Sequence, residues 1–93
     1  MYLLISMVQD FPVFICGLKD KTIVHSLNDK SKLSDIYEFI NNKYGLISRL
    51  YYIVHGCKII DPISRTVDEF NKNLEDKRKI SSDSNFRVTF RNI

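Results

Sequence analysis

Tryptophan is absent from this 93-residue chain, and glycine, proline and cysteine are scarce, with three, two and two residues. The low glycine and proline content excludes collagen-like and low-complexity disordered chains, which are rich in both. Two cysteines, Cys16 and Cys57, are too few for the disulfide framework of a small secreted domain. We therefore expect two free thiols in a reducing compartment, and a cytoplasmic or nuclear protein.

The sequence also lacks a long hydrophobic run, since a bilayer-spanning helix needs about 20 consecutive apolar residues. The apolar opening Met1-Tyr-Leu-Leu-Ile-Ser-Met-Val8 has no basic residue before it and no small-residue cleavage pattern after it, so it does not resemble a signal peptide. We interpret residues 1–10 as an apolar arm or an extra strand, followed by one domain over residues 11–93. No membrane association is expected.

A strong charge of one sign is missing as well. Fourteen lysines and arginines stand against 11 acidic residues, for a net charge of +3. This balance falls short of the clustered basic residues of a dedicated nucleic-acid binder. RNA is therefore only weakly indicated as a partner.

Motifs for catalysis or metal binding are not found. The chain has no phosphate-cradling glycine loop, no Gly-x-Ser-x-Gly and no paired carboxylates flanked by apolar sequence. Cys16, His25, His55 and Cys57 lack the Cys-x-x-Cys unit of a zinc site and fall on separate predicted elements. We expect no enzyme activity, no metal or other cofactor, and no small-molecule substrate.

What the sequence does contain is a series of short periodic segments. Alternating apolar and polar residues predict strands, and apolar residues three to four apart predict helices. Turn residues separate these segments. In chain order the patterns predict strands over 13–18 and 22–27, a helix over 33–44, strands over 50–54 and 59–60, a helix over 67–77 and a strand over 86–91.

The two predicted helices have recognisable ends. Leu33, Ile36 and Ile40 form one apolar stripe, and Gly45 stands where a left-handed C-terminal cap is wanted. The second helix begins with Thr66-Val67-Asp68-Glu69, which fits a capping box. Val67, Phe70 and Leu74 keep helical spacing, and the pairs Asp68/Lys72 and Glu75/Lys79 are four apart. These features predict a continuous helix from about Val67 to Lys77.

Two segments resemble ubiquitin. Leu18-Lys-Asp-Lys-Thr-Ile23 is similar to its Leu-Thr-Gly-Lys-Thr-Ile turn, and Arg65-Thr-Val-Asp-Glu-Phe-Asn71 is similar to its Arg-Thr-Leu-Ser-Asp-Tyr-Asn segment. The resemblance implies an α+β, ubiquitin-like β-grasp fold. In this fold a mixed sheet of four to five strands packs on one main helix, here with a short second helix.

The resemblance also implies a binding surface. Ubiquitin binds most partners through a shallow apolar patch on its sheet with a basic rim. Carried over to this sequence, and with the N-terminal arm as its extension, the predicted protein-binding residues are Leu18, Tyr51, Ile53, Arg87, Thr89 and Arg91.

The chain ends in Arg91-Asn92-Ile93, whereas conjugation of ubiquitin requires a C-terminal Gly-Gly. We therefore expect a non-conjugated ubiquitin-like protein that acts through noncovalent contacts with a protein, as a free module or a structural subunit of a larger complex. Two alternatives stay open. One is an RNA-contacting ubiquitin-fold subunit of a ribonucleoprotein such as the ribosome, and the other is a modifier whose glycine tail is not part of this chain.

Overall fold

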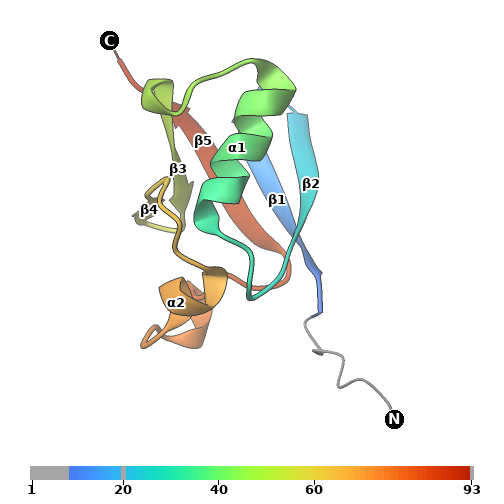
Figure 1. The fold of residues 1–93 in the computed structure, drawn as a ribbon, viewed down its shortest axis with the longest axis vertical. Coiled ribbons are helices and arrows are strands. Elements are labelled where there is room, and N and C mark those ends of the chain that lie inside the picture. Colours follow the sequence, from blue (N-terminus) through green and yellow to red (C-terminus); the bar gives the residue numbers. More distant parts are fainter. Residues whose placement is uncertain (1–8, 20, 93) are drawn as a thin grey trace.

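The computed structural model describes residues 9–19 and 21–92, which form one mixed sheet crossed by one long helix (Figure 1). The elements, in chain order, are β1 (Phe11–Leu18), β2 (Lys21–Leu27), α1 (Leu33–Tyr44), β3 (Tyr51–His55), β4 (Lys58–Ile60), α2 (Val67–Asn71) and β5 (Ser84–Phe90). Short 3-10 helices, Ser48–Leu50 and Asp76–Arg78, precede β3 and follow α2. The predicted order of strands and helices is confirmed.

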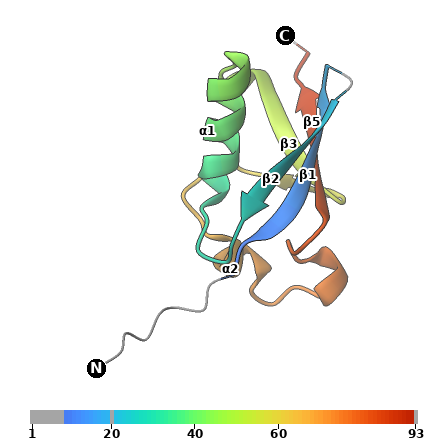
Figure 2. The same cartoon turned by 90° about the vertical axis from the view of Figure 1, so that its right-hand side faces the viewer.

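The strands lie in the order β2-β1-β5-β3-β4. The first and last strands of the chain pair in parallel at the centre of the sheet, and every other neighbouring pair is antiparallel. Helix α1 lies across one face, as the two perpendicular views show (Figures 1 and 2). No α-helix formed by the described residues covers the opposite face of the sheet, which we call the outer face.

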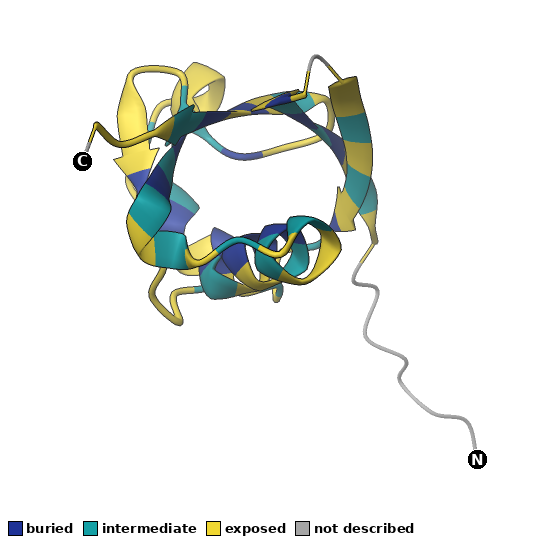
Figure 3. Ribbon diagram, turned by 90° about the horizontal axis from the view of Figure 1, so that it is seen from above, coloured by how far each residue is buried: buried dark blue, intermediate teal, exposed yellow. Residues whose placement is uncertain are grey.

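The core lies between α1 and the sheet. The predicted helix stripe of Leu33, Ile36 and Ile40 is at most 2% exposed. Along the strands, buried residues alternate with more exposed ones (Figure 3). The residues that share this core are Val13, Ile15, Leu18, Leu27, Leu33, Ile36, Tyr37, Ile40, Tyr51, Ile53, Ile60, Val67, Phe70, Ile80, Phe86 and Val88.

The alternation of apolar and polar residues over 86–91 predicts that Phe86, Val88 and Phe90 face the core, and Phe90 departs from this pattern. Phe86 and Val88 are buried as expected, but Phe90 is 50% exposed. It is the last residue of β5, and its ring is tilted against that of Tyr51 with centroids 6.1 Å apart. Its expected position in the core is therefore wrong.

A buried tyrosine joins α1 to both strands of the second hairpin. The Tyr37 hydroxyl donates a hydrogen bond to the Ile60 carbonyl and accepts one, 3.0 Å long, from the Ile53 amide. The Tyr51 hydroxyl in turn donates to Asn41 Oδ1 at 2.6 Å. Burial raises the pKa of Tyr37, and burial is also the main cause that raises the pKa of Tyr51 to about 12.

The second helix is shorter than predicted. Helix α2 ends at Asn71, and Asn73 has a positive φ of 66°, which an asparagine tolerates but a continuous α-helix does not. Instead, the Asn71 side chain forms hydrogen bonds with the backbone of Ile80, where the chain comes back to the end of α2. Its Nδ2 donates to the Ile80 carbonyl at 2.8 Å, and its Oδ1 accepts from the Ile80 amide at 2.7 Å.

The ion pairs expected from a continuous helix are absent from the described part of the chain. Asp68 pairs with Lys30 across a 3.9 Å gap rather than with Lys72. Lys79 pairs with Asp76 at 3.3 Å rather than with Glu75. The single long helix over 67–77 is therefore wrong, because the break at residues 72–73 changes which side chains are neighbours.

The start of α2 is as predicted. Thr66 Oγ1 accepts a hydrogen bond from the Glu69 amide at 3.1 Å, and Glu69 Oε1 accepts one from the Thr66 amide at 3.0 Å. These backbone and side-chain hydrogen bonds from Thr66 also lower the pKa of Glu69. The capping box is confirmed.

We expect Thr66→Ala to reduce the free energy of unfolding by about 1 kcal/mol, because the Glu69 amide loses its acceptor. Urea denaturation followed by circular dichroism measures the change. Thr66→Ser is the control, since it keeps the hydroxyl and should retain most of the stability. Equal losses for alanine and serine would contradict the role assigned to the hydroxyl.

Candidate functional site

The side chains of β3 point to the opposite faces from those predicted. Tyr51 and Ile53 are both fully buried and point toward the core. The adjacent Tyr52 and Val54 are half-buried and belong to the outer face. Because strand side chains alternate, a shift of one residue moves every side chain to the other face. The assignment of Tyr51 and Ile53 to an exposed binding surface is wrong.

Leu18 is also buried, at 2% exposure, and its predicted place on the surface is wrong. The cause is a bulge. The pairing of β1 with β2 shifts register between Ile15 and Leu18, which turns Leu18 inward. Gly17 makes this possible, since its φ is +94° and a Cβ there would lie 2.4 Å from the Val88 carbonyl oxygen.

The remaining predicted residues, Arg87, Thr89 and Arg91, lie outside the core, with Arg87 and Arg91 exposed and Thr89 half-buried. Thr89 is paired with Tyr52 across the β3–β5 ladder, as Arg87 is with Val54. Their role in binding stays a prediction. Three of the six predicted residues thus lie together outside the core, and the other three are buried in it.

In place of the three buried residues, the outer face of β3 and β4 presents Tyr52, Val54 and Ile59. Val54 pairs with Ile59 on β4, and Ile59 is 52% exposed. The guanidinium of Arg91 lies over the Tyr52 ring, 5.2 Å from its centroid. We define the β3–β5 patch as these outer-face residues of the second half of the sheet: Tyr52, Val54, Ile59, Arg87, Thr89 and Arg91.

Two hollows adjoin this patch. The first, of about 600 Å³, lies over the centre of the outer face and is lined by Cys16, Val54, Gly56, Asn85, Arg87 and Thr89. The second, of about 760 Å³, lies beside the β3–β4 turn. It is lined by His55, Gly56, Cys57, Lys58, Leu74, Lys77, Arg78 and Asn85, and we call it the basic groove.

His55 forms the inner wall of the basic groove. Its Nε2 lies 3.3 Å from Ser84 Oγ, and its ring centroid is 5.3 Å from that of Phe86. Burial lowers the pKa of His55, which favours its neutral form at neutral pH. The positive charge of the groove therefore comes from lysine and arginine.

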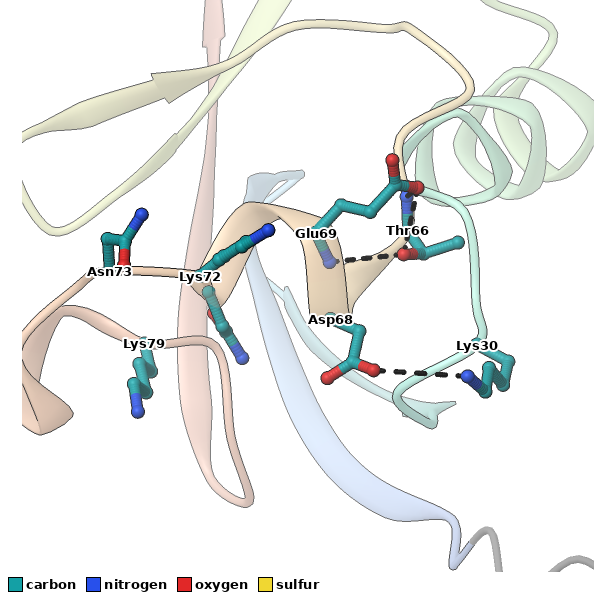
Figure 4. Close-up of a pocket in the computed structure, with 8 residues that line it drawn as sticks. Lys30, Thr66, Asp68, Glu69, Lys72, Asn73 and Lys79 are labelled. Carbon is teal, nitrogen blue, oxygen red and sulfur yellow. Dashed lines mark hydrogen bonds and ion pairs between the residues drawn. The ribbon is translucent and has the colours of Figure 1, made fainter.

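A third hollow, of about 620 Å³, lies at the start of α2 (Figure 4). Four of its eight lining residues interact in pairs, since Thr66 and Glu69 form the capping box and Lys30 pairs with Asp68. These contacts stabilise the start of α2, so the presence of these four residues is explained by a structural role and requires no ligand.

Groups with catalytic or metal-binding potential are dispersed over the described residues. Within residues 9–19 and 21–92, no cluster of three or more histidine, cysteine or acidic side chains could hold a metal ion. Cys16 and Cys57 are free thiols, as predicted. His25 stacks on Phe39 with ring centroids 4.3 Å apart, and burial lowers the pKa of His25.

None of the helices formed by the described residues has both the length and the apolar character needed to cross a bilayer.

The architecture is that of the ubiquitin-like β-grasp fold, with a mixed five-stranded sheet, one main helix and a short second helix. Among solved structures, the UBL domain of yeast Ddi1 superimposes with a TM-score of 0.71 at 10% sequence identity, over 90% of this chain and 92% of that domain. No protein-family model matches the sequence, and no curated protein matches it significantly. The predicted fold is confirmed.

Proposed function

We propose that this protein is a noncovalent protein-interaction module, and that the β3–β5 patch is its binding surface. The observation that carries the proposal is the patch itself. Val54 and the 52%-exposed Ile59 lie side by side on the helix-free face, with Arg87 beside Val54 and Arg91 over Tyr52. An apolar centre with tyrosine and a cationic rim is the composition enriched in protein interfaces.

The resemblance to ubiquitin supports the same face. It implies an apolar patch on the sheet, and the one-residue correction moves its centre from buried Ile53 to Val54. The predicted contribution of the N-terminal arm falls on residues outside the described part of the chain and remains a prediction. The module proposed here consists of residues 11–93, acting alone or as a fixed subunit of a complex.

The test is affinity purification from an extract of the native source, with Val54→Glu compared with the wild type. We expect the wild type to retain a protein partner and Val54→Glu to lose it, because a carboxylate would replace the apolar centre of the patch. Val24→Glu is the matched control, since Val24 is 61% exposed on β2 at the far edge of the sheet. Retention of the same partner by Val54→Glu would overturn the proposed surface.

Denaturing electrophoresis tests whether the partner is bound noncovalently. The partner should separate from the protein on denaturing electrophoresis, whereas a conjugate would keep the added mass. RNA contact, the alternative considered from the sequence, predicts a steep fall in affinity with salt because counterions are released from the phosphate chain. A steep salt slope for RNA together with loss of the protein partner after nuclease treatment would replace the protein partner with RNA.

A further inference from the structure

We infer that the basic groove binds an acidic segment of the protein partner, in continuation of the β3–β5 patch. The inference rests on the proposed function and adds the chemistry of the partner. The groove lies between the β3–β4 turn and the segment that follows α2, away from the centre of the patch.

The lining of the groove is cationic around an apolar floor. Lys58, Lys77 and Arg78 line it, and none of the described residues in that lining is acidic. Leu74 is half-buried and packs against the core from the groove side. This arrangement fits carboxylates at the rim and one apolar side chain on the floor.

Among the lysines of the groove, Lys58 is held in position without being neutralised, and Lys77 is only weakly paired. The Lys58 ammonium lies 4.9 Å above the centre of the Phe70 ring, a cation–π contact that orients it without cancelling its charge. Lys77 pairs with Glu75 at 3.7 Å, but both side chains are about two-thirds or more exposed, at 79% and 68%. Exposed pairs of this kind are weak, so an incoming carboxylate can compete for Lys77.

The groove and the patch are connected. Gly56 and Asn85 line both the basic groove and the hollow over the outer face, so the two hollows adjoin. A single extended segment can therefore contact Val54 and Arg87 in one hollow and Lys77 in the other. A partner with an acidic stretch beside an apolar residue matches both.

An acidic peptide fits the groove better than RNA does. Single-stranded RNA binds by stacking its bases on exposed aromatic rings. The ring that lines the groove, that of half-buried His55, lies against Phe86.

The experiment uses the full chain, labelled with ¹⁵N, and a synthetic peptide Glu-Glu-Leu-Glu-Glu-Leu-Glu-Glu as the probe. The double variant Lys77→Glu/Arg78→Glu reverses the charge of the groove. The control, Lys21→Glu/Lys43→Glu, changes the net charge equally at the start of β2 and in the last turn of α1, at the opposite end of the molecule from α2 (Figure 1). The same peptide with lysine for glutamate, and oligouridylate, are the comparison ligands.

We expect the acidic peptide to shift the amide signals of residues 55–58, 74–78 and 85. Reversal of Lys77 and Arg78 should weaken its affinity about tenfold, while the control binds nearly as the wild type does. Equal affinity for both double variants, or tighter binding of oligouridylate at these amides, would overturn the inference.

The two proposals fail in different ways. Shifts confined to the β3–β5 patch would overturn the groove and leave the patch in place. If the native partner is retained by Val54→Glu but lost by Lys77→Glu/Arg78→Glu, the groove stands and the proposed surface falls.

Discussion

Replacement of Ile53 with glutamate is expected to leave the chain unfolded at room temperature. Ile53 is fully buried in the sheet, where it pairs with Ile60 on one side and Val88 on the other. The substitution removes a core side chain, a loss of about 2–5 kcal/mol, and places a carboxylate in an apolar site at a cost of several more. Domains of this size have only about 5–15 kcal/mol of stability. Far-UV circular dichroism shows whether the fold survives.

Val54→Glu, one residue further along the same strand, is the matched control. Its side chain belongs to the outer face, so we expect the variant to fold and to lose about 1 kcal/mol or less in urea denaturation. Similar behaviour of the two variants would contradict the register of β3. This pair also validates the binding test, since loss of a partner by Val54→Glu is informative only if the variant folds.

Tyr37→Phe is expected to lower the free energy of unfolding by about 2–4 kcal/mol, although it removes a single oxygen atom. The hydroxyl satisfies two buried backbone groups at once, the Ile53 amide and the Ile60 carbonyl. Each group left without a partner costs about 1–3 kcal/mol. Phenylalanine cannot replace either hydrogen bond, and urea denaturation measures the loss.

Tyr44→Phe makes the same chemical change on the same helix and serves as the control. The Tyr44 ring is partly buried, and its hydroxyl has no hydrogen bond to any of the residues that the structure describes. A small loss is therefore expected there. Equal losses at both positions would show that the Tyr37 hydroxyl does not bridge the strands.

The tyrosine pKa values predict how stability changes at alkaline pH. The folded-state pKa of Tyr37 is raised from 10.0, and that of Tyr51 is raised to about 12. A raised pKa means that the stabilisation is complete below the unfolded-state pKa near 10 and is lost as the pH rises toward the folded-state value. The urea midpoint of the wild type should therefore fall above pH 10. Tyr37→Phe should show a smaller fall, because one of the two titrating groups is gone.

Much of the fold was predictable because local and long-range signals agree. The α1 stripe is periodic, and Gly45 takes the left-handed conformation expected of a helix cap, with a φ of 66°. Strand β5 alternates between apolar and polar residues over most of its length. The capping box at Thr66 needs only residues three apart. Each of these signals lies within one segment and requires no knowledge of distant contacts.

The faces of β3 could not be predicted in the same way. Tyr51, Tyr52, Ile53 and Val54 are all apolar or aromatic, so alternation within the strand does not say which side is inward. The register against Val88 decides it, and that contact is between distant segments. The patch residues Tyr52 and Val54 were missed for this reason, although the alternation of β5 does indicate which of its own side chains point inward.

Two other errors have similar causes. The position of Leu18 depends on a bulge, which one glycine suggests but does not specify. The end of α2 depends on the hydrogen bonds between Asn71 and the backbone of Ile80, nine residues away in the sequence. Helical spacing and favourable charge pairs continue past this point, so the sequence predicts a longer helix than the fold allows.

The two hydrogen bonds between Asn71 and Ile80 also make the intervening segment separable from the rest of the domain. They join the two ends of the loop formed by residues 72–79, and we call this junction the neck and the loop the tip. Phe70 and Ile80, next to the neck, are buried. The cost of closing a loop rises only slowly with its length. The tip can therefore be exchanged or lengthened while the neck and core are kept. Because Leu74, Lys77 and Arg78 lie on that tip, such grafts would change the lining of the basic groove without redesigning the sheet.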